Sequence, residues 1–333
     1  MAAPDTLLAI ENLRVSFGDG PQARPALDGI SFAVRRGRTL GIVGESGCGK
    51  SLTALSIMRL LPSPPARLVG GRILFSREGA PARDLAALDP RAMRSLRGKD
   101  IAMIFQEPMT ALDPVYPIGD QIAEVLTEHE GLSRKEALAR AVELLRLVGV
   151  PSPDERVRQY PHEFSGGMRQ RAVIAIALAC SPALLIADEP TTALDVTVQA
   201  QVLRLMKDIQ ARFGSAILFI THDMGVVGQM ADDVIVMYLG KVVEEGPVRA
   251  VLSHPAHPYT QGLIASIPTL RMPRDRVLEP IAGVVPPIGS ITSGCRFRTR
   301  CPHAMDVCRD DPPVRVAPAG NRAACWLLEE GVP

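Results

Sequence analysis

The sequence predicts an α/β fold with a mostly parallel sheet, in a chain of 333 residues. Three apolar runs carry this prediction: TLGIVG at 39–44, ALLIAD at 183–188 and AILFIT at 216–221. Strands buried on both faces read as continuous apolar runs rather than as alternating patterns. Helix-like segments separate the three runs, and strands that alternate with helices indicate parallel pairing.

The N-terminal region predicts a strand, then a second strand, a glycine-rich loop and a helix. Residues 1–17 contain Asp5 and Glu11 where a secretory signal would be apolar, so we interpret them as a strand rather than a leader. The run at 39–44 leads into a loop with three glycines, and residues 51–61 predict the helix that follows. This strand, loop and helix form half of a phosphate-binding α/β unit.

The middle of the chain, from about 110 to 165, predicts a helical insert. Ser133 and Glu136 have the spacing of a capping box, and apolar residues recur at helical spacing from there to Gly149. Beyond the insert we expect helices at 169–180 and 196–212, and a hairpin at 232–246 that turns near Gly240.

The last part of the chain has a different composition. Twelve of the 29 prolines and four of the six cysteines lie after residue 250. The high proline content of this region predicts a separate appendage with little regular structure. We therefore expect an α/β domain at 1–250, which includes the helical insert, and a C-terminal extension at 251–333.

Charge and hydropathy exclude several classes of protein. Thirty-seven basic and thirty-six acidic residues give a net charge of +1, so no global field attracts nucleic acid or anionic lipid. The longest apolar stretch, 172–187, is interrupted by Ser181-Pro182 and is shorter than the roughly 20 residues of a membrane span. We expect a soluble protein whose cysteines are reduced thiols or metal ligands.

The segment GESGCGKS at 44–51 matches the pattern GxxxxGK[ST]. Glycines let successive backbone N–H groups curl around a phosphate, the lysine reaches the β and γ phosphates, and the final hydroxyl ligates Mg²⁺. This assigns Lys50 to the phosphates and Ser51 to the metal. The whole candidate cradle is Gly44, Glu45, Ser46, Gly47, Cys48, Gly49, Lys50, Ser51 and Leu52.

A second motif, LLIADEP at 184–190, ends a buried strand in two carboxylates. Adjacent acids at a strand end are usually a solvated turn, but here they follow the phosphate-binding loop by 138 residues and lie at the end of an apolar strand. Asp188 then holds Mg²⁺ through water, and Glu189 polarises the water that attacks the γ phosphate.

With these motifs, the sequence resembles the ATP-binding cassette family. FSGGMRQR at 164–171 is similar to the signature motif of that family, with Met168 where glutamine is usual. The resemblance implies further roles for single residues, namely Gln106 as the Q-loop glutamine and a magnesium ligand, Asp195 in the D-loop, His222 as the switch histidine and Phe17 as the adenine-stacking aromatic. With Glu189 and His222 both present, we expect a site that hydrolyses ATP, with Glu189, His222 and Gln106 as its catalytic residues.

The resemblance also implies the architecture and a partner. The expected fold is a P-loop nucleotide-binding domain with a RecA-like core, an antiparallel β subdomain and a helical subdomain. In this family Ser165, Gly166 and Gly167 bind the γ phosphate of ATP held by a second cassette, so that two subunits enclose two nucleotides. The sequence leaves open whether the second subunit is a copy or a different chain, and we favour a different chain.

Four cysteines of the extension follow the spacing C-x5-C-x6-C-x16-C, at Cys295, Cys301, Cys308 and Cys325. Four thiolates suit tetrahedral zinc or a four-iron cluster, and His303 could replace one zinc ligand. HPYTQGLI at 257–264 and CRFRTRCP at 295–302 resemble the extension of oligopeptide and dipeptide importer ATPases. That extension is associated with a [4Fe-4S] cluster, which we therefore expect in preference to zinc.

The resemblance implies an ATPase that lies on the cytoplasmic side of the cell membrane as a peripheral subunit. It would energise two transmembrane permease subunits that import peptides delivered by an extracytoplasmic binding protein. Importers of nickel or glutathione share much of the motif set and remain alternatives. A cassette ATPase serving translation or DNA repair is disfavoured, because such factors usually carry two cassettes or a long coiled coil; we expect no nucleic-acid partner.

Overall fold

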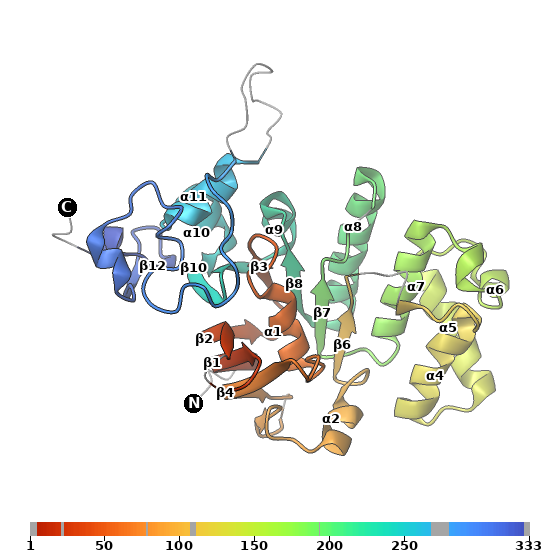
Figure 1. Cartoon of the computed structure of the whole chain (residues 1–333). Coiled ribbons are helices and arrows are strands. Elements are labelled where there is room, and N and C mark those ends of the chain that lie inside the picture. Colours follow the sequence, from red (N-terminus) through yellow and green to blue (C-terminus); the bar gives the residue numbers. More distant parts are fainter. Residues whose placement is uncertain are drawn as a thin grey trace. The chain divides into compact units, whose positions relative to one another are not determined.

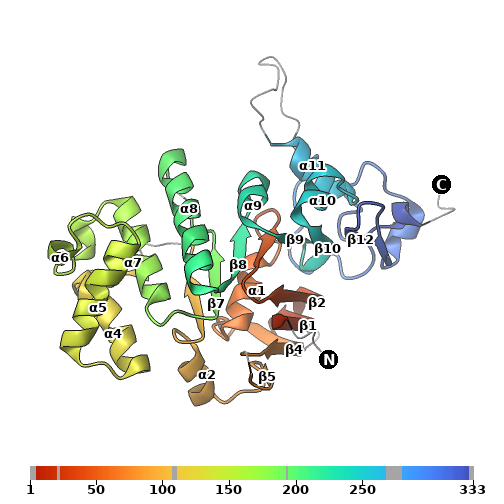
Figure 2. The same ribbon diagram turned by 180° about the vertical axis from the view of Figure 1, so that it is seen from behind.

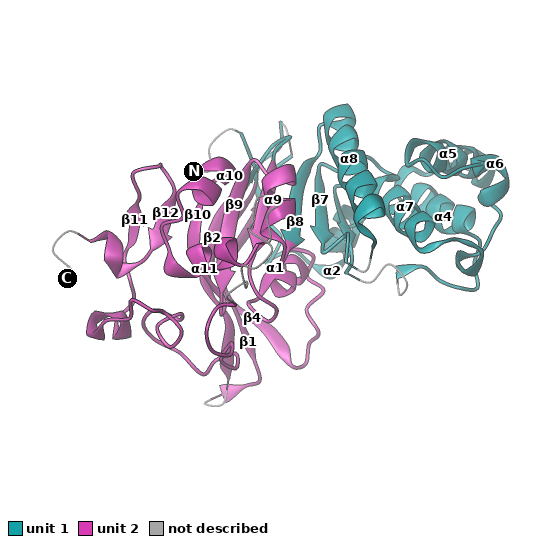
Figure 3. Ribbon diagram, turned by 90° about the horizontal axis from the view of Figure 1, so that it is seen from above, with its two compact units in different colours: residues 1–7, 34–38, 76–220 teal, residues 8–33, 39–75, 221–333 magenta. Residues whose placement is uncertain are grey.

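A computed structural model describes residues 5–20, 23–77, 79–106, 111–192, 194–267 and 280–329. The chain divides into two units, which Figure 3 colours separately. The first unit comprises residues 1–7, 34–38 and 76–220, and the second comprises 8–33, 39–75 and 221–333.

A parallel sheet forms the centre of the first unit. Its strands follow the order β8-β7-β6, with β6 at Ile101–Ile104, β7 at Leu184–Asp188 and β8 at Ala216–Thr221. Leu184 lies opposite both Ile101 and Ala216, and every side chain of β7 and β8 is buried. The two apolar runs that predicted these strands are therefore confirmed. A short strand and a helix precede this sheet in the sequence: β5 (Arg83–Asp84) and α2 (Pro90–Leu96).

Helices form the rest of the first unit. Figures 1 and 2 show α4, α5, α6 and α7 gathered together and α8 beside β7. The expected capping box begins α5: the Ser133 hydroxyl accepts from the Glu136 N–H, and the Glu136 carboxylate accepts from the Ser133 N–H. The helices are α4 (Ile118–Glu130), α5 (Arg134–Leu147), α6 (Pro153–Arg156), α7 (Gly166–Leu178) and α8 (Val196–Phe213), with a 3-10 turn, η2, at Pro161–Glu163.

The second unit contains a sheet with the order β2-β1-β4. Strands β1 (Thr6–Phe17) and β4 (Ala66–Phe75) are antiparallel, and β2 spans Arg24–Arg35. Leu8 lies opposite Phe75 at one end of the pair, and Phe17 opposite Ala66 at the other. The strand expected at the N-terminus is therefore present.

Strand β3 (Thr39–Val43) lies parallel to β9 (Asp233–Tyr238), which forms a hairpin with β10 (Lys241–Pro247). The hairpin turns at Gly240, whose φ of 76° belongs to the left-handed region that glycine tolerates. Two helices flank β3 and β9 in the sequence: α1 (Lys50–Ile57) and α9 (Met224–Met230). The expected helix at 51–61 ends early, because Arg59 adopts a left-handed φ of 50°.

The residues after 250 contain regular structure and join the sheet of the second unit, whereas the expected boundary at residue 250 stays a prediction. Strand β12 pairs antiparallel with β10, with Ala323 opposite Glu244, and so extends the sheet to the order β11-β12-β10-β9-β3. The pairing of β12 with β10 involves too few residues to produce a hydrophobic pattern that could be recognised in the sequence. The described elements after β10 are α10 (Val248–Ser253), α11 (Pro258–Ala265), η3 (Asp306–Arg309), β11 (Val314–Val316), β12 (Arg322–Ala324) and η4 (Trp326–Leu328), while 268–279 and 330–333 lie outside the described residues.

Aromatic and charged side chains hold the extension to the second unit. The rings of Tyr238, Tyr259 and Phe297 are buried together, with centroids 4.7 to 5.3 Å apart. The Glu244 carboxylate on β10 is 1% exposed and accepts hydrogen bonds from the backbone N–H groups of Ala256 and His257, each at 2.9 Å. The Asn321 side-chain amide is a third donor to this carboxylate.

Candidate functional site

The glycine loop joins β3 to α1 in the second unit, where the sequence predicted it. Gly44 has no room for a side chain, because a Cβ there would lie 2.3 Å from the carbonyl oxygen of Met237. Gly49 has a φ of 104°, and a Cβ there would lie 2.7 Å from the Leu27 side chain. Ser46 and Gly47 are exposed at the tip of the loop. The two close approaches fix the loop against β9 and β2 while its tip remains open.

Lys50 turns back onto its own loop. Its Nζ donates to the carbonyl oxygens of Gly44 at 2.8 Å and Glu45 at 3.1 Å, and the residue is 5% exposed. Cys48 is also buried, and its burial raises the pKa of the thiol. Ser51 and Leu52 follow on the first turn of α1. When Lys50 binds a triphosphate, its hydrogen bonds to the two carbonyl oxygens are replaced by hydrogen bonds to phosphate oxygens. The lysine therefore contributes to binding only the free-energy difference between these two sets of hydrogen bonds.

Glu45 on the same loop contacts two residues that the sequence did not single out. Its backbone N–H donates to the Tyr259 hydroxyl at 2.8 Å. Its carboxylate accepts two hydrogen bonds from Arg300, at 2.6 and 3.1 Å. These partners lie 214 and 255 positions further along the chain, and no local pattern connects them to the loop.

The two acids after β7 have different surroundings in the first unit. Asp188 is the last residue of the strand and is 3% exposed. Glu189 has a left-handed φ of 47°, and its backbone N–H donates to the carbonyl oxygen of Ile220 at 2.9 Å. A non-glycine residue in that region is strained and is held there by its surroundings. The turn therefore leaves the Asp188 side chain buried and directs the Glu189 side chain to other polar side chains.

The Glu189 carboxylate is held by two donors. Gln106 Nε2 lies 3.2 Å from Glu189 Oε2, and the Thr192 hydroxyl lies 2.9 Å from the same oxygen. The structure therefore brings together Gln106 and Glu189, two of the three residues expected to be catalytic. Thr192 was missed, although its position three residues after Glu189 places it on the same turn.

The signature segment begins α7 in the first unit. Ser165 is the N-cap, and its hydroxyl accepts from the Met168 N–H at 3.4 Å. A Cβ on Gly166 would meet nothing within 4 Å, whereas one on Gly167 would lie 3.1 Å from Val198. Ser165 and Gly166 are exposed, so their polar groups at this helix N-terminus face solvent. Asp195 caps α8 in the same way, accepting from the Val198 N–H at 2.9 Å.

The remaining candidate residues lie in the second unit. His222 is exposed between β8 and α9. Phe17 ends β1 and is half-buried. The glycine loop, Phe17 and His222 thus belong to one unit, while Gln106, Ser165, Asp188 and Glu189 belong to the other. Their convergence on one nucleotide stays a prediction.

The four cysteines of the extension line one small cavity of about 10 Å³, together with His257 and His303. Burial raises the pKa of Cys295 to about 11, with the neighbouring thiols adding to the shift, and burial also raises the pKa values of Cys301 and Cys325. Among the described residues, no group of three or more His, Cys, Asp or Glu side chains is placed to hold a metal ion. The expected iron–sulfur cluster therefore finds no support as a metal site, although its four candidate ligands share one cavity.

His257 presents an unsatisfied donor at this cavity. Its Nδ1 accepts from the Tyr259 N–H at 3.1 Å, so a neutral ring carries its proton on Nε2. That Nε2 is buried and has no hydrogen-bond partner within the described part of the chain. Four thiols and one N–H donor therefore line the cavity.

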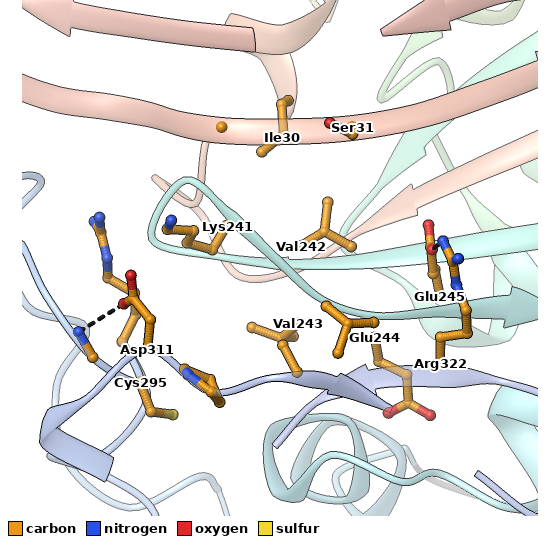
Figure 4. A pocket seen from close by; sticks show the side chains of 16 residues that line it. Ile30, Ser31, Lys241, Val242, Val243, Glu244, Glu245, Cys295, Asp311 and Arg322 are labelled. Carbon is orange, nitrogen blue, oxygen red and sulfur yellow. Dashed lines mark hydrogen bonds and ion pairs between the residues drawn. The ribbon is translucent and has the colours of Figure 1, made fainter. Parts of the chain in front are cut away.

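A second cavity of about 510 Å³ lies between β2, β10 and the extension (Figure 4). Its charged groups are paired with one another or with neighbours: Arg322 pairs with Glu245, and the Asp311 carboxylate accepts from the Gly294 N–H at 2.8 Å. Lys241 and Arg296 both reach Asp28, at 3.1 and 2.6 Å. These pairs link the extension to β2 and β10.

Within the described residues, none of the helices combines the length and apolar character needed to cross a bilayer.

Two family models match the chain. One is described as ABC transporter and matches residues 27–192. The other is described as oligopeptide/dipeptide transporter, C-terminal region, and matches residues 243–308. The first covers the glycine loop, the signature segment and the acidic strand, and the second covers three of the four clustered cysteines.

Whole-length relatives share about half of their residues with this chain. A probable peptide ABC transporter ATP-binding protein of Sinorhizobium fredii is 52% identical over 98% of this chain and 97% of its own length. The dipeptide transport ATP-binding protein DppD of Bacillus subtilis is 49% identical over 98% of this chain and 96% of its own.

Solved structures resemble the chain in fold. A dimeric ATP-binding cassette, MJ0796, in a post-hydrolysis state with ADP and inorganic phosphate, aligns with a TM-score of 0.63 at 25% identity. The alignment covers 73% of this chain and 99% of that one. The cassette fold expected from the motifs is confirmed by this likeness.

Proposed function

The chain belongs to the family of ABC transporter ATP-binding proteins and is an ATPase of that family, and from this premise we propose that it energises the import of oligopeptides or dipeptides. The single observation that carries the ATPase mechanism is the presence of two features in one chain. One is a glycine loop that places Lys50 among its own carbonyl oxygens; the other is a Glu189 carboxylate that Gln106 and Thr192 hold in place.

In the proposed reaction, the glycine loop binds the β and γ phosphates through its backbone N–H groups and Lys50. Ser51, Asp188 and Gln106 would hold Mg²⁺, which would neutralise charge on the phosphates. Glu189 accepts a proton from the attacking water, and His222 contacts the γ phosphate. The bonds from Gln106 and Thr192 support the role of Glu189, because a base must be held still to orient a water molecule.

The signature segment supplies the contact to a second cassette in this proposal. Exposed Ser165 and Gly166 at the start of α7 support it, since helix N-termini bind anions when their N–H groups are accessible. ATP then holds two cassettes together, and hydrolysis releases them. Because the second cassette has its own gene in our proposal, mixing this chain with that subunit should raise ATP turnover.

The variant Glu189→Gln tests the assignment of the base. We expect ATP turnover to fall at least 100-fold while ATP binding stays within about threefold, because the amide cannot take a proton but keeps the side-chain shape. Glu143→Gln, at an exposed carboxylate paired with Arg140 on α5, is the matched control and should leave turnover unchanged. Sustained hydrolysis by Glu189→Gln would assign the base elsewhere.

The proposed cargo rests on the relatives, whose names specify peptides and dipeptides, and on the match of residues 243–308. We propose two transmembrane permease subunits and an extracytoplasmic binding protein as further partners, with the ATPase on the cytoplasmic face of the membrane. Uptake of labelled di- and oligopeptides by cells with and without the gene tests this. Loss of nickel or glutathione uptake with peptide uptake intact would identify one of the alternative cargoes.

We also propose that Cys295, Cys301, Cys308 and Cys325 hold a [4Fe-4S] cluster, with zinc as the alternative. The proposal rests on the four thiols that line one cavity, where the buried Nε2 of His257 has no partner among the described residues, although these residues are not arranged as a ready metal site. When bound, such a cluster links four segments of the extension covalently. Protein purified without oxygen should contain iron and acid-labile sulfide and absorb broadly in the visible range, whereas zinc without iron would establish the alternative.

We retain the division into a domain at 1–250 and an extension at 251–333 as a proposal. The start of the second family match, at residue 243, supports a boundary in this region.

A further inference from the structure

The glycine loop carries a carboxylate that a residue of the extension neutralises. Arg300 approaches Glu45 with both terminal nitrogens, at 2.6 Å to Oε2 and 3.1 Å to Oε1. The arginine side chain is 4% exposed and the glutamate side chain 28% exposed. A two-bond arginine–carboxylate pair with one buried partner has a fixed geometry and is little screened by salt.

Arg300 is held in place by its surroundings before it meets Glu45. Its Nε donates to the carbonyl oxygen of Ala282 at 3.0 Å, and its guanidinium lies 5.8 Å from the ring centre of Tyr238 and 5.9 Å from that of Phe297. Aromatic faces and carbonyl oxygens favour a guanidinium in this position. The arginine is therefore a preorganised part of the extension.

Glu45 is also fixed through its backbone. Its N–H donates to the Tyr259 hydroxyl at 2.8 Å, and its carbonyl oxygen accepts from Lys50 Nζ at 3.1 Å. Tyr259 is fully buried on α11 and cannot follow the loop if it moves. One residue of the loop is thus anchored at its N–H, its side chain and its carbonyl oxygen, and the extension supplies two of these three contacts.

An unpaired carboxylate on this loop would repel a triphosphate. The loop of an ATPase has to bind a polyanion, and an acid within it opposes binding unless a cation neutralises it. We propose that Arg300 is a positioning residue for nucleotide binding, which neutralises Glu45 and so lets the glycine loop accept the phosphates. The extension is then part of the nucleotide site of this chain.

The charge argument is tested by a cycle of variants in the full chain: Arg300→Met, Glu45→Gln and the double variant. Equilibrium binding of a fluorescent ATP analogue and steady-state ATP hydrolysis are measured for each. We expect Arg300→Met to weaken binding and raise KM about tenfold while kcat stays within about twofold, because the loss falls on ground-state phosphate binding. Arg309→Met, at an exposed arginine paired with Asp306 in the same extension, is the matched control and should change neither quantity.

The other two variants separate charge from shape. Glu45→Gln removes the acid and leaves the arginine cation, so we expect equal or about threefold tighter binding. The double variant should return to within about twofold of the parent, since neither charge remains. A double variant as weak as Arg300→Met would overturn the proposal, because the arginine would then act independently of Glu45.

The proposal stays testable if Arg300→Met fails to fold. Melting temperatures are compared first, and Glu45→Gln alone then carries the test, since it preserves side-chain shape. Weaker binding of the ATP analogue by Glu45→Gln would refute the charge argument. An unchanged KM in a folded Arg300→Met variant would refute it as well.

Discussion

Replacing Asp28 by asparagine should destabilise the second unit by removing the negative charge shared by two cations. The Asp28 carboxylate accepts from Arg296 at 2.6 Å and pairs with Lys241 at 3.1 Å. Arg296 is 3% exposed, and its Nε has no hydrogen-bond partner within the described residues. The substitution keeps the side-chain shape but leaves the arginine cation buried without its counter-charge.

The magnitude follows from the burial of the two partners. Removing one member of a fully buried ion pair costs roughly 3–5 kcal/mol. Asp28 is 22% exposed, so water reaches this site and lowers the cost, and we expect about 2 kcal/mol. For a chain of this size that loss corresponds to a decrease of roughly 3 °C in melting temperature.

The effect should depend on pH with a definite sign. Burial would raise the pKa of Asp28, but the hydrogen bond and charge of Lys241, with the charge of Arg296, outweigh it and hold this pKa below its ordinary value of 3.8. A carboxyl with a lowered pKa stabilises the folded state fully above its unfolded pKa, and this contribution is lost as the pH falls through the folded pKa. The difference between parent and variant should therefore be constant near neutrality and shrink below about pH 4.

Thermal unfolding followed by circular dichroism at pH 7 and at pH 3 measures both effects. Asp306→Asn is the matched control, because its pair with Arg309 at 3.4 Å is exposed on both sides, and such pairs contribute less than about 1 kcal/mol. Equal melting temperatures of parent and Asp28→Asn at pH 7 would refute the reasoning. A difference as large at pH 3 as at pH 7 would show that the charge is not its source.

Two further substitutions test local features. Gly44→Ala should abolish binding of an ATP analogue, because its Cβ would lie 2.3 Å from the Met237 carbonyl oxygen; Gly70→Ala on β4, where the nearest atom to a Cβ would be Cδ of Arg14 at 3.8 Å, should retain binding, and equal affinities for both would contradict the steric argument. Ser133→Ala removes the hydroxyl that caps α5 and should cost about 1 kcal/mol in urea unfolding, against less than half of that for Ser95→Ala on α2, whose exposed hydroxyl donates to the Ala92 carbonyl oxygen and caps no helix.

Elements with a strong local pattern could be predicted from the sequence. Strands β7 and β8 are buried on both faces, so their apolar runs predicted them within a residue. The cap of α5 was readable because Ser133 and Glu136 are three residues apart and satisfy each other. The helix after the glycine loop was predicted too long, since Met58 to Leu61 continue its apolar pattern while the backbone turns at Arg59.

Contacts between distant segments could not be predicted. Strand β12 has three residues, too few to show a period, and it is a strand because β10 and β11 pair with it on either side. Arg300 appeared as one of several arginines near Cys301, and nothing local indicated that it meets Glu45. Glu189 was identified by its place after a buried strand, whereas the donor Thr192 depends on a left-handed turn that residue types do not reveal.

The buried carboxylate of Glu244 limits how this protein can be shortened. All three of its described donors, Ala256, His257 and Asn321, lie beyond residue 250, while the acid itself belongs to β10. A truncated cassette would keep an ionised group in an apolar setting without those donors and would also uncover the edge of β10. A fragment cut after the ATPase motifs is therefore a poor surrogate for the whole subunit, and assays of nucleotide turnover should use the uncut polypeptide.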